Sequence, residues 1–124
     1  MKRLITLILI FSTMIPTIVN AEDLYEIRAK QFSEQLDAYN DKHSENLEII
    51  VKYSDKERTE AEDSLYFWTV CNAVTNLERA EKLILDNPEY AQYLNGDVLP
   101  SIQENLDFHQ YAASLLDGTD AECK

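Results

Sequence analysis

Apolar and aromatic residues recur at steps of three and four along most of the chain, which is the spacing that places side chains on one face of a helix. Three long stretches show this pattern, and it predicts three amphipathic helices. In residues 22–53 the repeating positions are Tyr25, Ala29, Phe32, Leu36, Tyr39, His43, Leu47 and Ile50. In the second stretch they are Tyr66, Val70, Ala73, Leu77, Ala80 and Ile84, with Phe67 and Val74 beside them. In the last stretch they are Leu99, Ile102, Leu106, His109, Ala113 and Leu116.

Capping and helix-breaking residues set the expected ends of the first two helices. Ser54-Asp55-Lys56-Glu57 matches a capping box, so we expect the second helix to begin there. Pro88 should end it at Asp86 or Asn87, because the residue before a proline disfavours helical geometry. Residues 40–44 are weaker helix formers, and a kink or break in the first helix is an alternative there.

A short helix should follow, carrying Tyr90, Ala91, Tyr93 and Leu94. Asn87-Pro88 has the form of an N-cap followed by the first helical residue. Leu94-Asn95-Gly96 has the form of a helix end with a left-handed glycine. We then expect Asp97 to cap the last helix, with Pro100 in its first turn and Gly118 at its end.

These elements predict an all-α fold, an up-down-up three-helix bundle with one extra short helix. Cys71 and Cys123 are the only cysteines, and an even number in an exported chain predicts a disulfide, here one that fastens the C-terminal tail. In the chain-entropy model such a loop contributes on the order of 4 kcal/mol.

Residues 65–71 hold three consecutive aromatics and consist almost wholly of strand-favouring residues. We interpret them as helical, because the residues on both sides continue the same helical period; a strand is the alternative. On a helix Trp68 lies opposite the seam, together with Leu65. We expect the tail to cover both side chains, and the alternative is that they form an exposed anchor for a partner.

Residues 1–21 have the pattern of a secretory signal peptide: Lys2 and Arg3 precede an apolar run at 4–19, and Val19-Asn20-Ala21 resembles a cleavage site. The run is shorter than the roughly 20 residues that cross a bilayer, although an uncleaved anchor is an alternative. We therefore predict a single acidic helical domain at 22–124, periplasmic or secreted, with no membrane insertion after cleavage.

The formal net charge is −12, and residues 22–124 hold 9 Lys and Arg against 23 Asp and Glu, a net charge of −14. Nucleic acid and anionic membranes are poor partners for such a chain, whereas a basic protein is attracted to it. The alternative is that the charge only keeps an exported protein in solution.

Apolar residues beyond the seams suggest where a partner binds. The candidate interface comprises Leu65, Trp68, Tyr90, Tyr93, Phe108, Tyr111 and Leu115. The last three form a second apolar line on the last helix, which we expect to lie under the short helix; otherwise it is a partner or homodimer surface. The candidate acidic rim comprises Glu60, Glu62, Asp63, Asp107 and Asp117.

The sequence contains no familiar catalytic, phosphate-binding or metal-binding motif. His43 and His109 lie on packing seams, and counting helix rise places them roughly 13 Å apart in height, so we expect two separate core histidines. A pH-dependent switch is an alternative role for them. We expect no enzymatic activity and no cofactor or metal.

The function we expect is that of an exported binding module for a basic protein, as an inhibitor or immunity protein that neutralises a basic secreted enzyme or toxin. The alternative is a structural or stress-related envelope protein, holdase-like and non-enzymatic.

Overall fold

The computed structural model describes residues 20–124. Residues 1–19, which hold most of the predicted signal peptide, lie outside the described residues. The chain divides into two units, Met1–Gln31 and Phe32–Lys124. Helix α2 (Ala21–Tyr53) begins after Asn20, whose side-chain Oδ1 accepts a hydrogen bond of 2.9 Å from the backbone N–H of Asp23. None of the described helices is long and apolar enough to cross a membrane.

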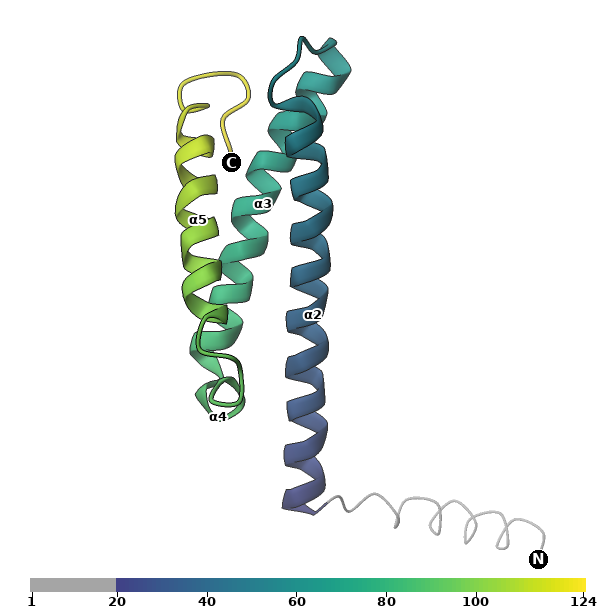
Figure 1. The fold of residues 1–124 in the computed structure, drawn as a ribbon, viewed down its shortest axis with the longest axis vertical. Helices are drawn as coiled ribbons and strands as arrows, with labels where there is room; N and C mark the ends of the chain where they lie inside the picture. Colours follow the sequence, from purple (N-terminus) through teal and green to yellow (C-terminus); the bar gives the residue numbers. More distant parts are fainter. Residues whose placement is uncertain (1–19) are drawn as a thin grey trace, which may run out of the picture. The chain divides into compact units, whose positions relative to one another are not determined.

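Within Phe32–Lys124 the rest of α2 packs with α3 (Glu60–Asp86), α4 (Pro88–Ala91) and α5 (Val98–Ser114). Figure 1 shows α3 beside α5, with α2 on its other side and the three long helices alternating in direction. The predicted up-down-up bundle with one extra short helix is confirmed. Residues 65–71 belong to α3 and form no strand, and α2 is unbroken through residues 40–44.

Helix α3 buries a second line of side chains beside its apolar seam. Its buried residues are Thr69, Val70, Ala73, Asn76, Leu77, Ala80 and Ile84. The hydroxyl of Thr69 donates to the carbonyl oxygen of Leu65 at 2.7 Å. The amide Nδ2 of Asn76 donates to the carbonyl oxygen of Tyr39 in α2 at 3.0 Å, which fixes the register of the two helices at this point. The hydrophobic pattern did not predict the burial of Thr69 and Asn76, because both residues are polar.

The predicted start of α3 at Ser54 is wrong. The N-cap is Thr59: its Oγ1 accepts a hydrogen bond from the backbone N–H of Glu62 at 3.2 Å, and the Glu62 carboxylate accepts one from the backbone N–H of Thr59 at 3.4 Å. The Ser54 hydroxyl instead donates back to the carbonyl oxygen of Val51, at the end of α2. Both segments fit the capping-box pattern, but Ser54-Asp55-Lys56-Glu57 lies in the loop that reverses the chain between α2 and α3.

Helix α4 begins at Pro88 as predicted but ends at Ala91, so Tyr93 and Leu94 lie beyond it, and Asn87 has a different role. Its side chain makes no capping bond to α4; its Nδ2 donates to the carbonyl oxygen of Leu83 at 2.8 Å and closes α3. On α4, the ring of Tyr90 lies 5.8 Å from that of Phe32, between centroids, so α4 packs on α2. Phe32 is buried in this contact.

The expected left-handed conformation of Gly96 is not found. Gly96 lies in a turn closed by the backbone N–H of Val98 and the carbonyl oxygen of Asn95. Asp97 precedes α5 as expected, but its side chain makes no capping bond. The predicted end of the last helix at Gly118 is wrong, because α5 ends at Ser114 with Leu115 as its C-cap. Gly118 lies in the turns that follow and is the one described residue with a positive φ, 79°.

The two histidines form a contact pair, so the predicted separation is wrong. Their ring centroids lie 5.8 Å apart, edge to face. The estimate from helix rise failed because residues 92–97 lead the chain back along α3 before α5 begins. Helix α5 therefore begins beside Ala80, and Val98 and Ala80 line the same groove. His109 is 2% exposed, and its Nδ1 donates to the carbonyl oxygen of Asn105 at 2.8 Å.

Three buried side-chain atoms in the described part of the chain have no hydrogen-bond partner, and two belong to this pair: Nδ1 of His43 and Nε2 of His109, with Nδ2 of Asn46 on α2 as the third. Burial of the imidazole, and secondarily the charge of His109, lowers the pKa of His43. Adding a proton here places a charge where little solvates it. The surroundings of His43 therefore favour its neutral form.

We predict that Thr59→Ala lowers the free energy of unfolding by about 1 kcal/mol, because one capping bond is lost. Ser54→Ala is the matched control and should change it by less than about 0.5 kcal/mol. Urea unfolding monitored by circular dichroism measures both. Equal losses in the two variants would contradict the assignment of Thr59 as the N-cap of α3.

We predict that the protein loses stability as the pH falls below about 6.5, the ordinary pKa of histidine. In that range the unfolded chain protonates His43, while the folded chain, with its lowered pKa, does not; the loss continues down to the folded-state pKa. In His43→Gln the free energy of unfolding should change less with pH just below 6.5. The loss of stability that follows from protonation of carboxylates at lower pH should remain. Denaturant unfolding from pH 7.5 to 5 is the measurement, and parallel profiles contradict the prediction.

Candidate functional site

The C-terminal tail is held against α3 by the predicted disulfide. Cys71 and Cys123 are bonded, with their Cα atoms 5.4 Å apart and a sequence separation of 52. Between α3 and the tail lies a hollow of about 880 Å³, here called the Trp68 hollow. It is lined by Glu60, Asp63, Ser64, Phe67, Trp68, Cys71, Asn72 and Thr75 of α3 and by residues 120–124.

The tail does not cover Trp68, contrary to expectation. Trp68 is 59% exposed and Leu65 is 38% exposed. The disulfide explains this, because it holds Cys123 beside Cys71, almost one helical turn beyond Trp68, so that the tail runs along one side of the indole. The tail therefore forms one wall of the hollow and leaves the indole open to solvent.

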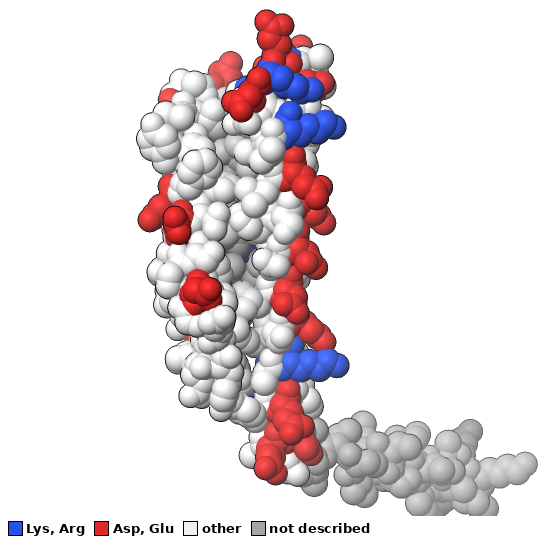
Figure 2. Space-filling model, in the orientation of Figure 1, with Lys and Arg blue, Asp and Glu red and all other residues white. Residues whose placement is uncertain are grey.

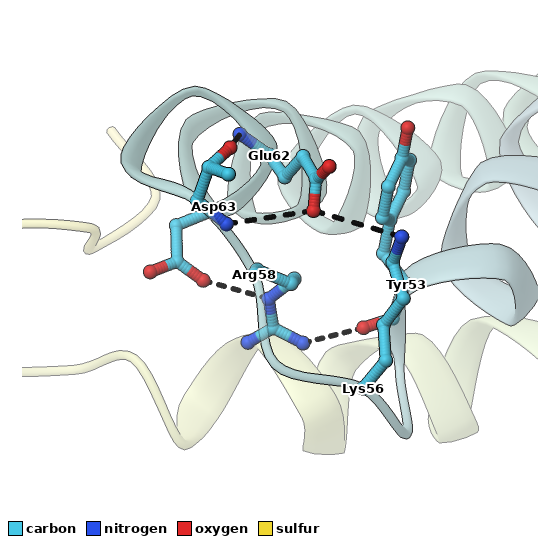
Figure 3. Close-up of polar contacts among 6 residues, drawn as sticks. Tyr53, Lys56, Arg58, Glu62 and Asp63 are labelled. Atoms are coloured by element: carbon cyan, nitrogen blue, oxygen red, sulfur yellow. Dashed lines mark hydrogen bonds and ion pairs between the residues drawn. The ribbon is translucent and has the colours of Figure 1, made fainter.

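Arg58 fixes the end of α3 that carries the hollow. Its guanidinium donates to a carboxylate oxygen of Asp63 and to the carbonyl oxygen of Tyr53, both at 2.6 Å (Figure 3). The same group lies 4.2 Å from the ring centroid of Tyr66 and 5.6 Å from that of Phe67. Ion pairing and cation–π contacts thus tie the loop before α3 to the aromatic face next to Trp68.

Two members of the predicted acidic rim are engaged in holding this loop. Glu62 completes the capping box and lies 3.7 Å from the Lys56 ammonium, and Asp63 pairs with Arg58 (Figure 3). Glu60 is exposed and lines the hollow. Of the rim predicted on α3, Glu60 therefore stays accessible to a partner.

Two carboxylates of the hollow were missed from the sequence. Asp120 and Glu122 line it, and both are exposed. Both lie within three residues before Cys123, so the predicted disulfide to Cys71 was the feature of the sequence that could have placed them near α3. With Glu60 and Asp63 they give the hollow four carboxylates, of which Asp63 is already paired with Arg58, against the single ammonium of Lys124.

The second apolar line of α5 is exposed rather than covered by α4. Phe108, Tyr111 and Leu115 are 64%, 66% and 65% exposed. Helix α4 cannot reach them, because it precedes the first turn of α5 and its Tyr90 packs on Phe32. Tyr93 is also exposed. The α5 line, defined here as Phe108, Tyr111 and Leu115, forms a surface of its own, since α5 contributes no residue to the Trp68 hollow.

Charge is unevenly distributed over the helices. Figure 2 shows acidic side chains along α2 and few charged side chains over α5. Helix α5 contains Glu104 and Asp107 and no Lys or Arg. Asp107 and Asp117, the predicted rim of the α5 line, are both exposed.

The Trp68 hollow therefore combines an open indole with a surplus of carboxylates. An indole face and a carboxylate both attract an ammonium or guanidinium group, and Trp and Arg dominate many protein interfaces. The residues described contain no group of three or more side chains suited to a metal ion. Comparison of the chain with protein-family models, with curated proteins and with solved structures found no match.

Proposed function

We propose that the protein is an exported binding module that recognises a basic protein at the Trp68 hollow. In this role it is an inhibitor or immunity protein that neutralises a basic secreted enzyme or toxin. The observation that carries the proposal is an indole 59% exposed among four carboxylates, on a surface held in place by a disulfide.

The geometry suits a cationic side chain from the partner. An Arg or Lys placed over Trp68 gains a cation–π contact of about 0.5–2 kcal/mol, and the carboxylates of the hollow attract the same charge. The disulfide and the Arg58 contacts hold the hollow in shape before binding, which lowers the entropic cost of association. The net charge of −12 accelerates encounter with a basic protein at low ionic strength.

Export to the periplasm or the cell exterior is part of the proposal. A disulfide persists in an oxidising compartment, and the charged and apolar pattern of residues 1–21 is typical of a secretory leader. A secreted basic enzyme or toxin occupies the same compartments.

We predict that Trp68→Ala abolishes capture of the basic partner, because an interface tryptophan of this kind contributes about 2 kcal/mol or more, roughly a 30-fold change in affinity. Residues 22–124 are immobilised as wild type, Trp68→Ala or Tyr93→Ala and exposed to an envelope extract of the producing organism. Tyr93 is the matched control, an exposed aromatic outside the hollow.

The proposal expects a basic protein that is retained by wild type and Tyr93→Ala, released by salt and lost from Trp68→Ala. The retained protein, if it is an enzyme, should be inhibited by the wild type. Retention that is insensitive to salt, or equal on all three baits, contradicts the proposal.

The α5 line favours a second candidate function, a holdase-like envelope protein. Its three large side chains offer an apolar surface, and the lowered pKa of the half-buried His43 beside His109 weakens the fold at acidic pH. We predict for this function that hydrophobic-dye binding and protection of an aggregating client rise together from pH 7 to pH 3. Tyr111→Glu should reduce both. A compact fold with constant dye binding throughout excludes it.

A further inference from the structure

A second concave site lies among α2, α3 and α5, within the unit Phe32–Lys124. It is a groove of about 430 Å³, a size typical of small-molecule sites. Its apolar wall is formed by Leu36, Leu77, Ala80, Leu94, Val98 and Ile102. The groove shares no residue with the Trp68 hollow, so what it binds is independent of the function proposed above.

The charged side chains of the groove are both carboxylates. Asp37 lies on α2 and Asp97 at the start of α5, and no Lys or Arg lines the groove. Among the described residues neither carboxylate makes a hydrogen bond or an ion pair, and Asp97 makes no capping bond to α5. An apolar groove whose anionic groups have no cation of their own is complementary to a ligand that carries one.

The remaining polar residues of the groove do not oppose a cation. Asn40, Ser101 and Asn105 carry oxygen atoms that accept hydrogen bonds from an ammonium or guanidinium group. His43 also lines the groove, and the lowered pKa of its ring, due first to burial and then to His109, keeps it uncharged at neutral pH. The groove is therefore negative at pH 7.

We propose that this groove binds a small organic cation with an apolar body, such as an alkylamine or an alkylguanidine. The alkyl part lies against the apolar wall and the charged group lies at Asp37 and Asp97. A neutral ligand leaves the two carboxylates unused, and an anion is repelled by them. A lone metal ion gains nothing from the apolar wall.

The test is a titration of residues 22–124 with hexylammonium chloride, followed by ¹H–¹⁵N NMR at constant ionic strength. Hexan-1-ol and hexanoate are the neutral and anionic probes of equal chain length. We expect saturable shifts of the backbone amides of Asn40, His43, Ser101 and Asn105 with hexylammonium, shifts at least fivefold weaker with hexanol and none with hexanoate. The titration is repeated in Trp68→Ala, so that any binding at the hollow is separated from binding in the groove.

Asp37→Asn with Asp97→Asn should weaken hexylammonium binding at least tenfold, which is roughly threefold or more for each exposed, partly screened carboxylate. The matched control is Asp107→Asn with Asp117→Asn, which changes the net charge equally outside the groove and should leave the affinity within twofold. Equal losses in the two double variants, equal binding of hexanol and hexylammonium, or the absence of saturable shifts at the groove overturns the proposal.

Discussion

Helix α3 lies between α2 and α5 and has to bury side chains toward both, and the rest of the structure depends on that constraint (Figure 1). Small and polar residues at Thr69, Ala73 and Asn76 complete its buried surface beside the larger apolar seam. Two specific links set the register: the hydrogen bond from Asn76 to the carbonyl oxygen of Tyr39, and the disulfide from Cys71 to the tail. The first joins α3 to α2, and the second ties the segment after α5 to α3.

A helix that packs on two sides has one narrow face left for solvent, and on α3 that face carries Trp68. A large aromatic side chain is costly to expose, but here the disulfide holds the tail to one side of the indole, and Arg58 contacts Tyr66 and Phe67 instead. The disulfide that stabilises the domain thus also shapes the hollow and places Asp120 and Glu122 beside the indole. Stability and the proposed recognition surface share the same covalent bond.

The contact between α2 and α5 is made with histidines where a small bundle normally uses leucine or isoleucine. The pair leaves Nδ1 of His43 and Nε2 of His109 without partners in a buried region, and an unsatisfied polar atom of this kind costs about 1–3 kcal/mol. The cost is tolerable because α3 supplies the main apolar core. The histidine pair makes the contact between α2 and α5 sensitive to protonation. At neutral pH the uncharged ring of His43 adds no positive charge to the adjoining groove.

Sequence patterns were enough to predict the three long helices, the end of α3 at Asp86, a short helix that begins at Pro88 and the pairing of Cys71 with Cys123. These follow from local periodicity, from proline and from a cysteine count, all of which act along the chain. Other features emerge only when the helices pack: which of two capping boxes starts α3, the contact between the histidine rings, the exposure of Trp68 and the α5 line, and the position of Asp37 and Asp97 in one groove. The exposure of Trp68 depends on the disulfide, and the other features depend on how residues 54–59 and 92–97 turn the chain. Such turns set the relative height of the helices, and a periodic pattern contains no information about height.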